Sequence, residues 1–279
     1  MRLFGLLALT MTAFASNSIL NRLALAPGDV GPVSYAAIRL IAGAAVLAFL
    51  LALRSQAAPK LSRSAVWSAA MLSLYALGFS YAYITLPTGP GALILFGAVQ
   101  VMSFAITLAR GQKIGAFSWL GACLAFAGLC YLLWPETSAP LDASGAALML
   151  IAALGWTLYT AAGARNTDPL GATALAFVIA VPVGGVAWGL LPDAINLRGA
   201  VLAAFSGAVT SGLGYALWYK VLPHISMPIA AVAQLTVPVI AALGGALVLG
   251  EALTLRFGGA TCAVLVGVAL TIYGQTRRK

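Results

Sequence analysis

Long apolar runs are the feature of this sequence that most limits its fold. Ten runs of roughly 20 residues follow one another with short links, at about 3–26, 32–53, 65–86, 90–109, 115–134, 143–163, 169–191, 199–220, 227–249 and 254–274. An α-helix of about 20 apolar residues matches the hydrocarbon core of a bilayer. The alternation of apolar and polar residues that marks a barrel strand is absent. The sequence therefore predicts an all-α integral membrane protein with ten transmembrane helices.

The composition agrees with lipid as the main solvent of the chain. Hydrophobic residues make up 62% of the 279 residues and charged residues only 8%, whereas a soluble domain carries about a quarter charged residues. Cys123, Cys130 and Cys262 lie inside apolar runs and lack the spacing of metal ligands. We expect them to be packing residues, and we expect no metal or other cofactor.

The positions of the charged residues predict the topology. With the N-terminus inside, the outer side keeps only Arg198 and Arg256, and Arg22 and Arg39 lie within helices. The other basic residues fall at cytoplasmic ends: Arg2, Arg54, Lys60, Arg63, Arg110, Lys113, Arg165, Lys220, Arg277, Arg278 and Lys279. Five of the six acids fall outside: Asp29, Glu136, Asp142, Asp193 and Glu251. This bias predicts cytoplasmic N- and C-termini and accounts for the net charge of +9 without a nucleic-acid partner.

A weak internal repeat divides the chain into two halves. At a constant offset of 139, GQKIGAFSWLGACLAFAGL (111–129) aligns with GEALTLRFGGATCAVLVGV (250–268), so that Gly128 falls on Gly267. The predicted units are residues 1–137 and 138–279, with five helices each. Because five is odd, the second unit enters the membrane with the opposite orientation. Secondary transporters use such inverted repeats to open alternately to either side around a site near the midplane.

The closing segment PVIAALGGALVLGEALTLRFGGATCAVLVGVAL (238–270), with Arg39 in the second of ten helices, resembles the drug/metabolite transporter superfamily, EamA type. This resemblance implies a carrier of small molecules in the bacterial cytoplasmic membrane. Within the superfamily, the pattern is similar to amino-acid exporters of the YddG type. The first half departs from the family pattern, because Val99–Gln100 and Gly111–Gln112 replace its proline and its glycine–glutamate pair.

Polar side chains within the apolar runs are the first set of candidate site residues, because polar groups inside lipid are costly. They are Ser16, Asn17, Gln100, Gln234 and Thr236. Each of them has an alternative role, which is to bond a neighbouring helix. Pro238 adds a predicted helix kink, since a proline removes the hydrogen bond to the carbonyl four residues earlier, here that of Gln234.

Arg39 is the most costly of the buried groups. It lies seven positions inside its run, roughly 10 Å along the helix axis, where a cation costs about 2.5–3.5 kcal/mol on insertion scales. A position facing the bundle, bonded to helix carbonyls or to cavity water, lowers that cost. Two roles remain open for Arg39: attraction of a carboxylate or another anion, and a structural tie between helices.

Aromatic residues form the second set of candidates. Tyr75, Phe79 and Tyr83 recur every four residues on one helix face. Trp156 pairs with Tyr159, and Tyr215 pairs with Trp218. The clustering predicts a pocket for an apolar or aromatic side chain, and ordinary core packing is the alternative.

The motifs that are missing exclude other classes of function. The sequence has no HExxH, no GxxxxGK[ST] loop and no acid predicted deep in a helix, so we expect neither an enzyme nor an ATP-driven pump. We predict a monomeric transporter or facilitator that exports amino acids, aromatic or apolar ones included, by alternating access. The alternatives are export of a drug, nucleoside or sugar, and a passive pore. Proton coupling has no obvious carrier group.

Overall fold

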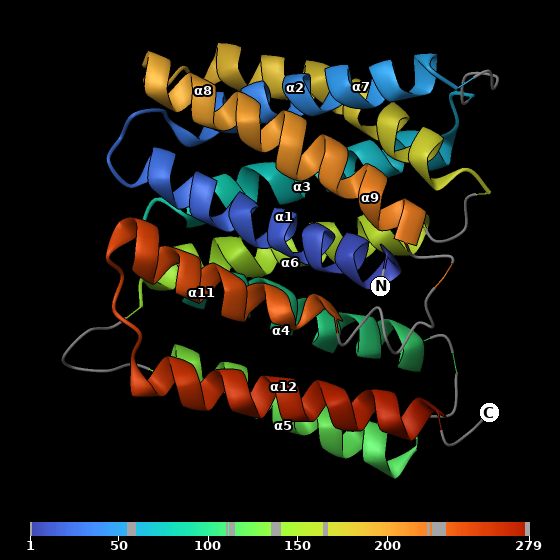
Figure 1. The fold of residues 1–279 in the computed structure, drawn as a ribbon, viewed down its shortest axis with the longest axis vertical. Coiled ribbons are helices and arrows are strands. Elements are labelled where there is room, and N and C mark those ends of the chain that lie inside the picture. Colours follow the sequence, from blue (N-terminus) through green and yellow to red (C-terminus); the bar gives the residue numbers. More distant parts are fainter. Residues whose placement is uncertain are drawn as a thin grey trace.

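The computed structural model describes residues 2–54, 60–109, 111, 115–134, 141–163, 167–221, 224 and 233–276. Within these ranges the chain is helical and forms no strand, and a single isolated bridge joins Val30 to Ile195. The helices, shown in Figure 1, are α1 (Arg2–Leu25), α2 (Pro32–Ala52), α3 (Arg63–Ala82), α4 (Thr88–Ala109), α5 (Ala116–Leu133), α6 (Ala143–Gly163), α7 (Pro169–Leu190), α8 (Leu197–Phe205), η1 (Ser206–Leu213), α9 (Gly214–Val221), α11 (Thr236–Leu249) and α12 (Leu255–Thr276).

These helices confirm the predicted all-α protein with several membrane spans. Eight spans in the described part of the chain are long and apolar enough to cross a bilayer, and one of them, Leu197–Val221, comprises α8, η1 and α9. Two further apolar helices are shorter in their described parts, Thr236–Leu249 and Leu255–Thr271. The predicted ninth span begins at residue 227, and its first residues, up to 232, lie outside the described ranges.

The helices run side by side, and the chain reverses direction between successive spans (Figure 1). Four carboxylates, those of Asp29, Asp142, Asp193 and Glu251, lie in the links at one end of the bundle, which we call the acidic end. Hydrogen bonds from the Ser144 hydroxyl, the Gly145 N–H and the Thr85 hydroxyl hold the pKa of Asp142 below its usual value. Glu136, predicted on the same side, lies outside the described residues.

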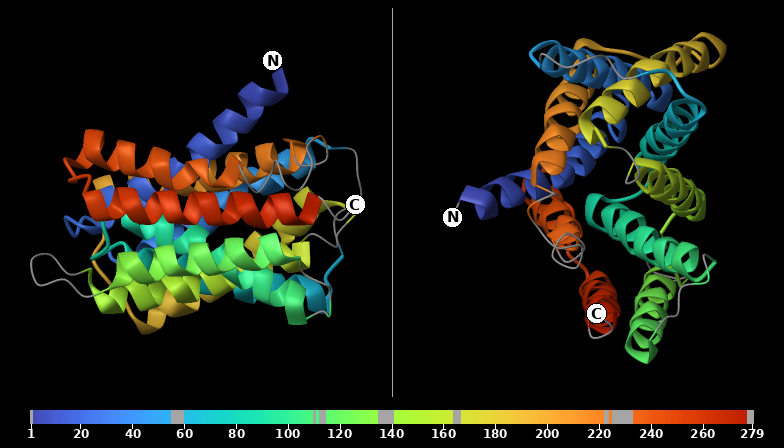
Figure 2. Two further views of the ribbon diagram at one scale, coloured as in Figure 1. Left: turned by 90° about the horizontal axis from the view of Figure 1, so that it is seen from below. Right: turned by 90° about the vertical axis from the view of Figure 1, so that its right-hand side faces the viewer.

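The N-terminus of α1 lies at the end of the bundle opposite the acidic end (Figure 1). Its first turns extend out of the bundle (Figure 2), and the side chain of Phe4 is 77% exposed there. From Thr10 onward the helix has buried positions. α1 therefore joins the core over its second half, which carries the polar residues Asn17 and Asn21.

Polar side chains define where several helices begin. Asp193, in the link before α8, accepts hydrogen bonds from the backbone N–H groups of Val33 (2.8 Å) and Ser34 (3.1 Å) in the first turn of α2. This carboxylate accepts hydrogen bonds from donors that have no partner within the helix itself. Its negative charge also interacts favourably with the positive N-terminal end of the helix dipole. Asp168 caps α7 and Asn196 caps α8 through their own side chains. Gly250 ends α11 in the left-handed conformation, with φ 68°.

Helices from the two halves of the sequence pack against each other. α2 contacts α7, α4 contacts α11, α5 contacts α12, and α1 contacts the α8–η1–α9 span. The backbones of α5 and α12 approach closely where small residues meet. A Cβ atom on Gly267 would lie 2.5 Å from both the Ala125 nitrogen and the Gly121 carbonyl oxygen.

A π-helical segment, η1, interrupts the span that contains α8 and α9. The hydropathy of the sequence gives no sign of it. Here η1 brings three hydroxyl residues, Ser206, Thr210 and Ser211, into the buried interior. Gly207 allows a close approach to α2, because a Cβ atom there would lie 2.8 Å from the Arg39 Cα. π-Helical turns occur frequently at functional sites.

Candidate substrate cavity

A small cavity lies between α1, α3, α4, α6, η1 and α9. Its volume of ≈ 20 Å³ leaves room for about one water molecule. The lining combines aromatic rings with a few polar groups: Phe14, Asn17, Ser18, Tyr75, Phe79, Leu95, Phe96, Trp156, Thr210 and Tyr215. A metabolite is much larger than this space, so helices must separate before one could enter.

Arg39 lies beside this cavity and is 2% exposed. Its Nε donates to the Ser211 hydroxyl (2.9 Å), and its Nη2 donates to the Tyr75 hydroxyl (3.1 Å). The guanidinium also lies 5.1 Å from the ring centre of Tyr75 and 5.4 Å from that of Phe79, within cation–π range. The partners are side-chain hydroxyls and rings, rather than the helix carbonyls that the sequence suggested.

The charge of Arg39 has no counter-ion among the described residues. No carboxylate in that part of the chain lies within 4.0 Å of it, and its buried Nη1 has no hydrogen-bond partner. Arginine stays protonated in proteins. The structure therefore places a fixed positive charge, with one donor unused, next to an aromatic cavity.

Asn17 links the cavity to η1 and α3. Its amide oxygen accepts hydrogen bonds from the Ser206 hydroxyl (2.7 Å) and the Thr210 hydroxyl (3.2 Å), and its amide nitrogen donates to the Tyr75 hydroxyl (3.3 Å). The Tyr75 hydroxyl therefore accepts from both Asn17 and Arg39. Since a hydroxyl keeps its own proton when it accepts, Tyr75 still has a donor for a group inside the cavity.

The aromatic lining forms one continuous cluster. Trp156 is its centre, with ring centroids 5.0 Å from Tyr75 and 5.3 Å from Tyr215, and Phe14 lies 5.8 Å from Tyr215. These separations are typical of favourable aromatic pairs. The buried hydroxyl of Tyr215 has no hydrogen-bond partner within the described ranges.

The predicted site residues fall into three groups. Asn17, Tyr75, Phe79, Trp156 and Tyr215 line the cavity, and Arg39 lies directly behind Tyr75 and Phe79.

Tyr83 and Tyr159 belong to the aromatic core next to the cavity. The ring of Tyr83 lies 4.8 Å from that of Phe79, and its hydroxyl donates to the Thr88 carbonyl. Tyr159 lies 5.6 Å from Trp156, and its hydroxyl shares a 2.9 Å hydrogen bond with that of Thr173.

The remaining candidates are not brought into the lining of this cavity; they are Ser16, Gln100, Gln234 and Thr236. The Thr236 hydroxyl instead donates to the Ala233 carbonyl at 2.6 Å. The helix is interrupted at Leu235, three residues before the buried Pro238. Transport roles for these four polar residues stay predictions.

Sequence reasoning missed several of the residues that the structure brings together. Phe14 and Ser18 lie one turn or less from Asn17 on α1, so a helical projection around Asn17 would have included them. Thr210 and Ser211 gave a second signal, because the stretch SGAVTSG concentrates hydroxyl groups in an apolar run. No sequence signal distinguished Leu95 and Phe96, since apolar residues fill most of the run at 90–109.

Comparison with known proteins identifies the family. A model of the EamA-like transporter family matches residues 143–273. A protein of Pseudomonas aeruginosa, described as uncharacterized, is 46% identical over 269 residues, covering 96% of this chain and 93% of the other. The chain belongs to the EamA-like transporter family. Family membership makes it a multi-pass membrane transporter of small molecules, not an enzyme.

Two more distant relatives and one solved structure are also similar to this chain. The uncharacterized transporter YwfM of Bacillus subtilis is 26% identical and covers 83% of this chain and 81% of its own. An uncharacterized transporter of Archaeoglobus fulgidus is 24% identical, with coverages of 72% and 74%. A crystal structure superposes with a TM-score of 0.67 at 19% identity, over 95% of this chain and 98% of that one. The similarity to this crystal structure supports the fold described above.

Proposed function

We propose that this EamA-family protein is a secondary transporter or facilitator that exports amino acids, aromatic or apolar ones included, in the manner of the YddG type. The observation that carries the proposal is the Arg39 charge, which is buried beside an aromatic cavity without a counter-ion among the described residues. A substrate carboxylate would accept hydrogen bonds from the hydroxyls of Tyr75 and Tyr215 under the influence of this charge. Trp156 and Phe14 would contact the side chain of the amino acid.

Alternating access is the proposed mechanism, with residues 1–137 and 138–279 as the two inverted units. Two observations support it: the repeat in the sequence, and the pairing of α2 with α7, α4 with α11 and α5 with α12. Each of these pairs joins helices that occupy equivalent places in the two halves. A cavity of ≈ 20 Å³ fits a closed state, from which the halves would separate at one end at a time.

The setting and the energy source are proposed on the same basis. We place the monomer in the bacterial cytoplasmic membrane, with both termini in the cytoplasm and no nucleic-acid partner. Export down a gradient is favoured over proton coupling, because the four described acids of the acidic end, and Asp168 at the opposite end, all lie in links between helices. The competing assignments are another substrate class, such as a drug, nucleoside or sugar, and a passive pore.

Counterflow in proteoliposomes tests the substrate class. Vesicles preloaded with one unlabelled compound are diluted into a trace of the same compound in radiolabelled form, with amino acids, nucleosides and sugars compared in parallel. We expect transient accumulation of apolar and aromatic amino acids above protein-free vesicles. Accumulation of nucleosides or sugars alone would assign a different substrate class. Equilibration without overshoot would favour a pore.

Substitution of Arg39 tests the group that carries the proposal. Arg39→Gln removes the charge that strengthens the hydrogen bonds from Tyr75 and Tyr215 to a substrate carboxylate, so amino-acid counterflow should fall roughly tenfold or more. Arg39→Lys keeps the charge and loses the planar fork of donors, so we expect partial activity. If both variants instead melt at clearly lower temperature and lose transport together, Arg39 is a structural tie between helices.

A further inference from the structure

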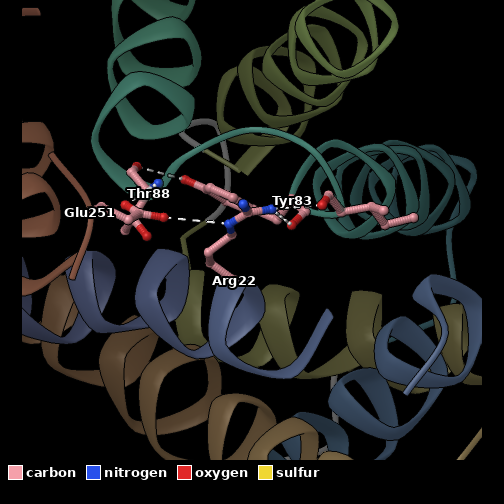
Figure 3. A network of polar contacts seen from close by, with 5 residues as sticks. Arg22, Tyr83, Thr88 and Glu251 are labelled. Atoms are coloured by element: carbon pink, nitrogen blue, oxygen red, sulfur yellow. Dashed lines mark hydrogen bonds and ion pairs between the residues drawn. The ribbon is translucent and has the colours of Figure 1, made fainter. Parts of the chain in front are cut away.

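Arg22 lies on α1 directly beyond the cavity, toward the acidic end. It follows the cavity-lining Ser18 by four residues, which is one helical turn, or roughly 6 Å along the axis. Its Nη1 donates to the carbonyl oxygens of Ile84 (2.6 Å) and Tyr83 (3.1 Å), the two residues that follow α3. Figure 3 shows this side chain extending from α1 across to the α3–α4 link.

Glu251 completes the network from the second half of the sequence. Its Oε1 lies 3.4 Å from the Arg22 Nε, as an ion pair without hydrogen-bond alignment. Its Oε2 accepts a 2.7 Å hydrogen bond from the Thr88 N–H at the start of α4. The Tyr83 hydroxyl donates to the Thr88 carbonyl at 3.3 Å (Figure 3). One carboxylate thus ties the α11–α12 link to α1 and to α4.

Burial distinguishes this ion pair from the other two in the described part of the chain. The side chains of Arg22 and Glu251 are 21% and 17% exposed. Each of the other pairs has a partner that is open to solvent: Arg198 is 55% exposed against 16% for Asp29, and Arg54 and Asp168 are 43% and 41% exposed. Ion pairs on open surface contribute little to stability. A half-buried pair that also bonds three backbone groups has a larger effect on the equilibrium between joined and separated segments.

We propose that Arg22 and Glu251 are the gate of the cavity at the acidic end, so that their separation admits or releases substrate there. This inference rests on the proposed alternating access. The segments that the pair holds together, the end of α1, the α3–α4 link and the α11–α12 link, come from both halves. They must therefore move relative to one another if the halves open at this end.

Buried polar side chains continue from the cavity-lining Asn17 along α1 and onto α3. The Asn21 amide donates to the Asn17 carbonyl (2.9 Å), and the Ser80 hydroxyl lies 3.4 Å from the Asn21 amide oxygen. Asn17 itself lines the cavity. Once the ion pair separates, a substrate leaving the cavity meets amide and hydroxyl groups on one side before it reaches Arg22.

The sequence gives the opposite end no equivalent ion pair. At the offset of 139, Glu251 corresponds to Gln112 and Arg22 corresponds to Ala161. The repeat therefore does not place a second copy of this pair at the opposite end, where the more exposed pair of Arg54 with Asp168 lies instead. Glu251→Gln would make the two halves alike at this position, which makes it the natural variant for a test.

Labelling of a single cysteine in the cavity tests the gate without any substrate. Ser18→Cys is introduced after replacement of Cys123, Cys130 and Cys262, and the purified protein reacts with a small anionic methanethiosulfonate reagent. We expect Glu251→Gln and Arg22→Gln each to raise the labelling rate roughly threefold to tenfold. The reciprocal exchange Arg22→Glu with Glu251→Arg should restore part of the slow labelling, because the pair re-forms with opposite polarity.

Two controls separate gating from loss of fold. Arg198→Gln removes the exposed ion pair at the same end and should leave the labelling rate unchanged. Melting temperature of each variant, measured in the same detergent, should stay near that of the parent. Equal labelling rates in the parent and in both gate variants would overturn the gate. Failure of the amino-acid proposal leaves this result intact, since no transported compound is used.

Discussion

At the scale of single residues, buried polar atoms without partners gather at the cavity. Seven buried side-chain atoms in the described part of the chain have no hydrogen bond, and one of them, Glu251 Oε1, is in the ion pair with Arg22. Three of the others lie in or beside the cavity: Ser18 Oγ, Arg39 Nη1 and Tyr215 Oη. An unpaired polar atom away from water costs about 1–3 kcal/mol. Such atoms persist in native proteins where a ligand or a water provides the missing partner. Their clustering, like the charge of Arg39, therefore indicates that a polar ligand binds in this cavity.

Tyr215→Phe tests whether one of these atoms contacts substrate. The change removes a buried hydroxyl that has no hydrogen-bond partner among the described residues, so the melting temperature should stay the same or rise slightly. If the hydroxyl binds a substrate carboxylate, the apparent KM in counterflow should rise roughly tenfold. Unchanged transport with unchanged stability would remove Tyr215 from the site.

Tyr159→Phe is the matched comparison for stability. The Tyr159 hydroxyl shares a hydrogen bond with the buried Thr173, so its removal costs the protein that bond. We expect a lower melting temperature for Tyr159→Phe than for Tyr215→Phe. The reverse order would contradict the hydrogen bonding described for the two tyrosines.

At the scale of helices, the ends of the spans could be predicted and their internal geometry could not. Hydropathy placed α2 at 32–53, against Pro32–Ala52 in the structure. The π-helical turns of η1 follow from contacts with α1 and α2, between residues about 170–190 positions apart, as in the bonds of Ser206 to Asn17 and of Ser211 to Arg39. A local stretch of sequence does not predict contacts with residues so far away in the chain.

Gly267→Ala tests the close approach of α5 and α12. A methyl group at this position would lie 2.5 Å from backbone atoms of α5, so the two helices must move apart. Such overpacking costs about 1–3 kcal/mol, and we expect the melting temperature in detergent to fall by several degrees. Gly258→Ala, on the same helix with open space around it, is the control. It should be neutral or stabilising, since alanine favours the helix.

At the scale of the whole molecule, the sequence predicted several of the residues that form the cavity but did not predict the contacts between them. Asn17 and Arg39 were identifiable because polar groups in apolar helices are few. The tyrosines and Trp156 were identifiable because they recur at helical spacing. That Arg39 bonds Tyr75 and Ser211 depends on how α2, α3 and η1 pack, which no local pattern specifies. The pair of Arg22 with Glu251 was missed for the same reason, since 229 positions separate the two residues.

The orientation of the two halves is tested by single cysteines at Ala58 and Thr137 in a cysteine-free background. The predicted topology puts residue 58 in the cytoplasm and residue 137 outside. A membrane-impermeant thiol reagent added to intact cells should therefore label only the cysteine at 137. After the cells are opened, both should react. Labelling of both from outside would contradict the inverted arrangement.

The charge of Arg39, which has no counter-ion in the described part of the chain, also affects how well the membrane retains its ion gradients. A sodium or hydronium ion within about 5 Å of a fixed cation meets about 3 kcal/mol of repulsion at an effective dielectric constant near 20, roughly a hundredfold disadvantage. If both ends of the cavity opened at the same time, few cations would therefore cross the protein. We expect vesicles containing the parent protein to retain an imposed pH difference, and those with Arg39→Gln to lose it faster. Rapid loss with the parent protein would disprove this. The charge that attracts a substrate carboxylate would then also prevent cations from leaking through the carrier.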